Sequence, residues 1–190
     1  MNAGGIEMGE EITCSWDPYG CQSLLGYGKA VHERSGGVCA YCGMGKDGLT
    51  FDMWRQLSVD HVIPTSSLGS QGWSQVEQYF PNLLKNQRDE LYKQINKCNL
   101  VTACNFCNSM TSRMKDIGLD SIMPEAPDET STSVDDPPVQ AMLSRLRERV
   151  DELLLKKRKH VLANLARLNQ EFVKTVVPNV KNAKHEETLD

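Results

Sequence analysis

Residues 99–108 read NLVTACNFCN, and the cysteine pair within them has a counterpart far upstream in the stretch CAYC. The two pairs are Cys39 with Cys42 and Cys104 with Cys107, and 61 residues lie between them. Each C-x2-C turn can aim two thiolates at one ion, and four thiolates complete the tetrahedral shell of a structural zinc site. The sequence therefore predicts a zinc ion that holds together the two ends of the long chain segment between the cysteine pairs. The alternative is that the thiols are redox-active or unbound.

The composition of the chain indicates the cellular compartment in which the protein is expected. The 190 residues are 39% hydrophobic, carry a formal net charge of -4 and include seven cysteines, an odd number. No apolar run approaches the roughly 18 residues of a membrane span, and the N-terminal residues do not resemble a leader peptide. We therefore expect a cytoplasmic protein without a membrane partner, whose cysteines are metal ligands or buried thiols.

The chain divides by composition. Residues 120–138 contain four prolines and six acids with few apolar groups, which predicts an acidic linker. A domain is expected before this linker and a long helix after it. The predicted organisation is a loosely ordered segment 1–22, a domain 23–119 with an insertion 65–98, the linker 120–138, a basic amphipathic helix 139–177 and a polar tail 178–190.

Local signals place elements within the domain. A helix is expected from about residue 24 to residue 34, strand material over 51–64, and a helix from near Asn105. The insertion 65–98 is either a DNA-contacting element that carries several lysines or additional core, and additional core is slightly favoured.

The segment 139–177 has apolar residues at three- and four-residue spacing, interrupted by the basic run KKRKH at 156–160. As one helix it would extend roughly 55–60 Å, at 1.5 Å per residue. That length favours self-association or extended contact with DNA. The alternative is two helices that fold back at the basic run.

Residues 58–64, SVDHVIP, place an aspartate beside a histidine in a short strand that ends before a proline. Adjacent strand residues face opposite sides of a sheet. Asp60 and His61 could therefore reach one ligand only where the strand ends or distorts.

The succession of CAYC, VDHVIP and NLVTACNFCN resembles the HNH endonuclease family, in its McrA-like, zinc-stapled branch. The resemblance covers about residues 38–115. It implies an α+β fold with a ββα-metal core, to which this chain adds the four-cysteine zinc site and the long C-terminal helix.

The resemblance also assigns roles. It implies that His61 is the general base for the attacking water, that Asp60 and Asn108 bind a catalytic Mg²⁺ or Mn²⁺, and that Asn99 fixes the loop and orients the histidine. Hard oxygen ligands suit these ions, whereas the thiolates suit zinc. Arg113 and Lys115 are candidate phosphate contacts, although the family often places its basic residue closer to the asparagine.

These inferences predict a metal-dependent DNA endonuclease, a hydrolase that uses one catalytic metal ion and a histidine base. Its partners would be DNA and, through the helix 139–177, a second copy of the chain. Family association places it in a prokaryotic or phage-infected cell. The alternative is a zinc-stapled DNA-binding or assembly protein that does not cut.

Overall fold

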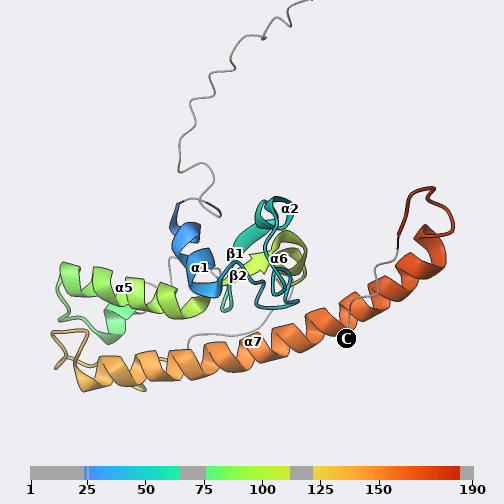
Figure 1. Cartoon of the computed structure of the whole chain (residues 1–190). Coiled ribbons are helices and arrows are strands. Elements are labelled where there is room, and N and C mark those ends of the chain that lie inside the picture. Colours follow the sequence, from blue (N-terminus) through green and yellow to red (C-terminus); the bar gives the residue numbers. More distant parts are fainter. Residues whose placement is uncertain (1–23, 25, 65–75, 112–121, 185–190) are drawn as a thin grey trace, which may run out of the picture.

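The structure, a computed structural model, describes residue 24 and residues 26–64, 76–111 and 122–184 (Figure 1). The predicted segment 1–22 lies outside the described residues, as do Arg113 and Lys115. The fold mixes helices with a two-stranded sheet, and a long C-terminal helix runs along it.

The sheet pairs strands that are distant in sequence. Strand β1 (Leu57–His61) is antiparallel to β2 (Leu100–Cys104), with Leu57 opposite Cys104 and His61 opposite Leu100. Helix α6 (Asn105–Thr111) follows β2 directly. The order strand, strand, helix therefore brings the second cysteine pair beside β1.

Side chains of the two strands alternate between the two faces of the sheet. One face carries Ser58, Asp60, Val101 and Ala103, and the other carries Val59, His61, Leu100 and Thr102, as the register requires. Adjacent residues Asp60 and His61 thus belong to opposite faces.

Different helices cover these faces. Helix α1 (Tyr27–Ser35) lies on the Thr102 face, where Val31 packs with Val59 and Leu100. His32 of α1 is buried and its Nδ1 is 2.9 Å from Thr102 Oγ1. Helix α6 lies on the Asp60 face, and α7 contacts α6 there.

Strand material was predicted over residues 51–64, and that prediction is wrong for the first part. Helix α2 (Phe51–Trp54) occupies it, and the strand begins only at Leu57. The Thr50 side chain accepts a hydrogen bond from the Met53 amide at 3.2 Å, a helix N-cap. This local bond satisfies an amide that a strand would have directed to a neighbour.

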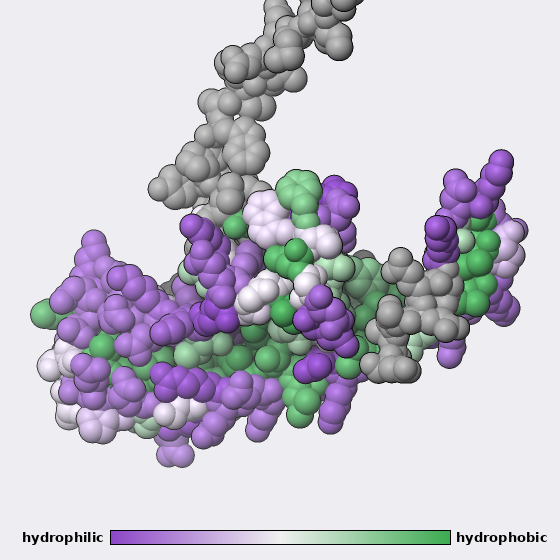
Figure 2. Space-filling model, in the orientation of Figure 1, coloured by the Kyte–Doolittle hydropathy of each residue, from purple (hydrophilic) through white to green (hydrophobic). Residues whose placement is uncertain are grey.

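The main apolar core lies where α5 (Lys85–Asn99) packs on α7 (Pro137–Glu171) (Figure 1). Leu91 and Ile95 of α5 are buried against Leu143 and Leu146 of α7. Figure 2 shows apolar surface, in green, along the seam between these helices. The described part of the insertion 65–98 therefore contributes core.

Residues 120–138 were expected to be a linker, and their described part instead packs on this core. Ile122 is 1% exposed, and Met123 and Val134 are also buried. The Asp128 amide donates to the Tyr79 carbonyl at 2.7 Å, and the Val134 amide donates to Gln87 Oε1 at 3.0 Å. A few apolar residues anchor the segment because α5 and α7 already offer a surface to them.

Helix α7 is continuous through the basic run, so the alternative of two helices folded back at residues 156–160 is wrong. It begins at Pro137, where the missing amide of proline costs nothing, and ends at Glu171 before the π-helical turn η2 (Phe172–Val176). Its buried residues end at Val161, and Figure 1 shows the remainder projecting past the sheet. Among the described residues, no helix is long and apolar enough to cross a membrane.

Candidate metal centre and the adjoining polar cluster

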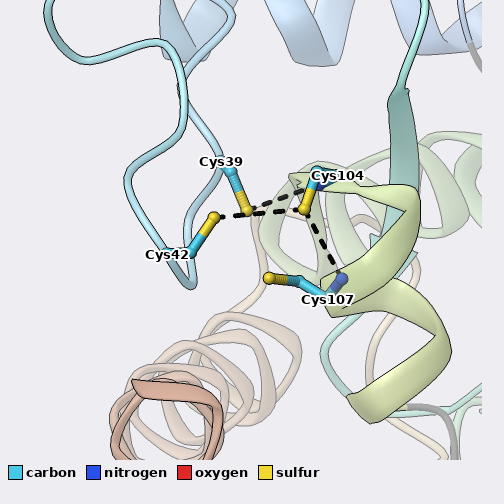
Figure 3. A group of neighbouring side chains, drawn as sticks. All are labelled: Cys39, Cys42, Cys104 and Cys107. Carbon is cyan, nitrogen blue, oxygen red and sulfur yellow. Dashed lines mark hydrogen bonds between the residues drawn. The ribbon is translucent and has the colours of Figure 1, made fainter. Parts of the chain in front are cut away.

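The four cysteines of the two C-x2-C pairs meet at one point. Cys39 and Cys42 come from the loop after α1, Cys104 ends β2, and Cys107 lies in α6 (Figure 3). Their sulfur atoms all lie within 4.8 Å of one another, and none forms a disulfide. This group could hold a metal ion, and four thiolates are compatible with structural zinc.

Backbone amides support the cluster. The Cys104 amide donates to Cys39 Sγ at 3.3 Å, and the Cys107 amide donates to Cys104 Sγ at 3.5 Å (Figure 3). Hydrogen bonds of this kind stabilise negative charge on sulfur. Gly43 follows the first pair with a φ of 79°, a left-handed conformation that lets the chain turn back after Cys42.

The thiols also influence one another's ionisation. Hydrogen bonds from neighbouring thiols, chiefly from Cys104, lower the pKa of Cys39, and the thiol of Cys107 is the main cause that lowers the pKa of Cys104 to about 7. The pKa values of Cys42 and Cys107 are raised, in each case chiefly by the hydrogen bond with Cys104. The close approach of the four thiols thus lowers the pKa of some of them and raises the pKa of the others.

Asp60 lies within a buried polar cluster beside the cysteines. The residue is 7% exposed, and its Oδ2 accepts hydrogen bonds from Tyr41 Oη and from Thr111 Oγ1, the latter at 3.1 Å. Lys157 Nζ from α7 is 3.6 Å from the same oxygen. We call Asp60, Tyr41, Thr111 and Lys157 the Asp60 cluster.

Burial sets the protonation of two members of this cluster. It raises the pKa of the Tyr41 hydroxyl, and the neighbouring Asp60 raises it further, so Tyr41 is a hydrogen-bond donor at neutral pH. Burial lowers the pKa of Lys157, and Asp60 acts against that change. Because the Lys157 side chain is only 4% exposed, the ion pair is screened little by solvent.

His61 occupies the last position of β1 and is half-buried. Burial lowers the pKa of its imidazole below the ordinary value of 6.5; Asp60 raises that pKa and Lys157 lowers it. The ring is therefore neutral at pH 7 and able to accept a proton. It faces away from the carboxylate of Asp60, because β1 keeps its regular register to its end.

Asn99 is fully buried and holds the loop that follows β1. Its Oδ1 accepts from the Ile63 amide at 2.8 Å, and its Nδ2 donates to the Ile63 carbonyl at 3.0 Å. The Val62 amide donates to the Asn99 carbonyl at 3.0 Å. Asn99 thus fixes the chain just after His61 and touches neither the cysteines nor Asp60 through a hydrogen bond.

Asn108 on α6 faces β1. Its Nδ2 donates to Ser58 Oγ at 3.0 Å and lies 3.4 Å from the Val59 carbonyl. Within the described part of the chain, Asn108 Oδ1 and Asp60 Oδ1 form no hydrogen bond or ion pair. Carboxylate and amide oxygens are the type of ligand that magnesium takes.

Sequence reasoning missed three members of the Asp60 cluster. Tyr41 lies inside CAYC, a motif in which only the cysteines indicated a function. Thr111 lies one helical turn after Asn108. Lys157 entered the sequence analysis only as part of the basic run KKRKH at 156–160. A signal existed, because Lys157 falls on the line of buried α7 residues Val150, Leu153 and Val161.

Comparison with known proteins adds no family to this description: no family model, curated protein or solved structure matches the chain. What is known of the site therefore rests on its own residues.

Proposed function

We propose that this chain is a metal-dependent endonuclease of the HNH type that hydrolyses phosphodiester bonds in DNA. The observation that carries the proposal is the strand-strand-helix unit that places Asp60 and Asn108 on the α6 side of the sheet beside a four-cysteine cluster, with His61 at the last position of the same strand. A structural scaffold requires the cysteines but does not require a neutral histidine at a strand end with an asparagine-braced loop behind it.

The cysteine cluster would hold structural zinc in this proposal. It ties the loop of Cys39 and Cys42 to the start of α6, and α6 carries Asn108. The zinc would thereby fix the distance between Asn108 and β1, so that the structural site positions the catalytic one.

His61 would be the general base and would have to reach the water around the end of β1, because its side chain belongs to the face opposite Asp60. Its imidazole is neutral at pH 7 and only half-buried, so a water molecule can reach the ring and give up a proton to it. Asn99 would hold the following loop and thereby restrict the position of the histidine.

Asp60 and Asn108 would hold the catalytic Mg²⁺ or Mn²⁺ through their oxygen atoms. Bound there, the ion would supply positive charge to the phosphate as negative charge develops on it. Exposed cations on α7, Lys156, Arg158 and Lys159, are proposed to contact the DNA backbone.

A specific observation favours the second candidate function, a DNA-binding or assembly protein that does not cut. The Asp60 carboxylate is neutralised by Lys157, an arrangement that also serves as a purely structural ion pair between β1 and α7. Association through α7 also stays a prediction, supported by exposed apolar side chains on its distal part, including Leu162 and Leu168.

Cleavage of supercoiled plasmid with Mg²⁺ or Mn²⁺ separates the two functions. Zinc-loaded protein is expected to nick or cut, and His61→Ala is expected to lose about 10²–10⁴-fold in rate, the usual contribution of a general base. His160→Ala is the matched control, because His160 is exposed on α7 and, among the described residues, its side chain is hydrogen-bonded to Asn164 on the same helix.

The outcomes are distinct. If folded, zinc-loaded wild type leaves plasmid and linear DNA intact with both ions, the nuclease proposal is wrong and the non-cutting function is favoured. If His61→Ala cuts as fast as the wild type, the assignment of the base is wrong although the activity is real.

A further inference from the structure

The Lys157 ammonium already occupies a cation position at the carboxylate proposed to bind the catalytic metal. It lies 3.6 Å from Asp60 Oδ2, with 4% of its side chain exposed. A lysine buried on an apolar helix face is rare unless it is paired, and Asp60 is its salt-bridge partner here. The pair therefore accounts for the direction in which Lys157 points.

From this geometry we infer that Lys157 competes with the divalent ion for Asp60, so that α7 carries an inhibitory cation against the metal site. The inference rests on the proposed function, because that function makes Asp60 a metal ligand. A metal ion that approaches Asp60 Oδ1 meets a carboxylate that is already neutralised, and it meets a positive charge on the other oxygen.

Electrostatics makes the competition strong in this environment. Interactions between charges a few ångströms apart are weakly screened when the groups are buried, and both Asp60 and Lys157 are less than a tenth exposed. The repulsion between ammonium and a divalent ion therefore opposes simultaneous occupancy.

The lysine can move without loss of the helix. Its neighbours Lys156 and Arg158 are exposed, so solvent lies close on both sides of the residue along α7. Its flexible four-carbon stem can carry the ammonium to that solvent while Val150, Leu153 and Val161 keep the helix seated. Metal loading therefore requires the Lys157 side chain to withdraw, and it does not require α7 to unfold.

Two hydroxyl groups would keep the carboxylate in place during this exchange. Tyr41 Oη and Thr111 Oγ1 both donate to Asp60 Oδ2, from the first cysteine loop and from α6. They hold the aspartate whether its cation is ammonium or metal.

The first test measures Mn²⁺ binding to full-length, zinc-loaded protein by electron paramagnetic resonance of the free ion. Lys157→Met keeps the length and apolar bulk of the side chain and removes its charge. It is expected to bind Mn²⁺ about tenfold or more tightly than the wild type, because the competing charge is gone. Lys156→Met, an exposed neighbour, is expected to match the wild type.

Asp60→Asn locates the ion. Introduced together with Lys157→Met, it is expected to abolish the gain in affinity. Equal Mn²⁺ affinity for Lys157→Met and the wild type, with both proteins folded by circular dichroism, would overturn the inference, and so would a gain that survives Asp60→Asn.

A second test uses the wild type and does not depend on whether the variant folds. Brief acetylation with an N-hydroxysuccinimide ester, followed by peptide mass spectrometry, reports the exposure of each lysine amine. Lys157 is expected to be protected without added Mn²⁺ and to become modified with it, whereas Lys156 is modified equally in both. Protection of Lys157 that is unchanged by saturating Mn²⁺ would refute the exchange.

These results can be separated from the cleavage assay. A wild type that cuts DNA while Lys157 stays protected would leave the proposed function standing and overturn the competition. Tighter Mn²⁺ binding by Lys157→Met in a protein that never cuts would do the reverse.

Discussion

Replacement of Asn99 by alanine tests the idea that this residue holds the loop behind β1. The amide makes two hydrogen bonds to the backbone of Ile63, of 2.8 and 3.0 Å, and both residues are fully buried. The substitution leaves one buried N–H and one buried C=O without their partners. Each such group costs about 1–3 kcal/mol, so the expected loss in the free energy of unfolding is about 2–6 kcal/mol.

Urea unfolding followed by far-ultraviolet circular dichroism, with zinc in excess, measures this loss. With an m value of roughly 2–3 kcal/mol/M, the midpoint should fall by about 0.7–3 M. Asn96→Ala on the same helix is the control, because Asn96 is half-buried and its side chain forms no hydrogen bond with a described residue. That variant should lie within about 0.5 kcal/mol of the wild type. If Asn99→Ala unfolds at the same midpoint as Asn96→Ala with an unchanged m value, the bracing role is refuted.

Three further perturbations follow from the packing and the site. Leu146→Ala, at a position 1% exposed, should cost about 2–5 kcal/mol in urea unfolding, whereas Leu155→Ala, at 55% exposure, should cost less than about 0.5 kcal/mol. Elemental analysis should find about one zinc per chain, lost in Cys104→Ser but retained in Cys98→Ser; zinc-free folded wild type would contradict the cluster. Proton NMR should show His61 titrating below 6.5 without added Mg²⁺. Since its folded pKa is depressed, the stability it contributes is present above pH 6.5 and declines as the pH falls below that value; titration at or above 6.5 would contradict its burial.

The parts of the fold that depend on local chemistry were predictable from sequence. Two C-x2-C turns predicted that Cys39, Cys42, Cys104 and Cys107 could hold one metal ion, because the ligand geometry of each turn is local and only the pairing is distant. The start of α6 at Asn105 follows from the same turn. The assigned roles of Asp60, His61, Asn99 and Asn108 stay predictions.

What sequence could not predict depends on contacts between distant segments. The charge partner of Asp60 is Lys157, far along the chain on another element, and no periodicity links the two. Ile122 and Val134 are buried because α5 and α7 provide a surface for them, although the composition around them is typical of a linker. At Phe51 a hydroxyl cap outweighed strand propensity, which is a small energy difference that composition cannot resolve.

The distance in sequence between Asp60 and Lys157 also sets an order of events during translation. The ribosome releases β1 first, then β2 and α6, and α7 only later, so the cysteine cluster and the sheet can form while the aspartate still lacks its ammonium. The emergence of α7 then neutralises this aspartate from within the chain. The ion pair between Lys157 and Asp60 therefore forms only after β1, β2 and α6 have been synthesised.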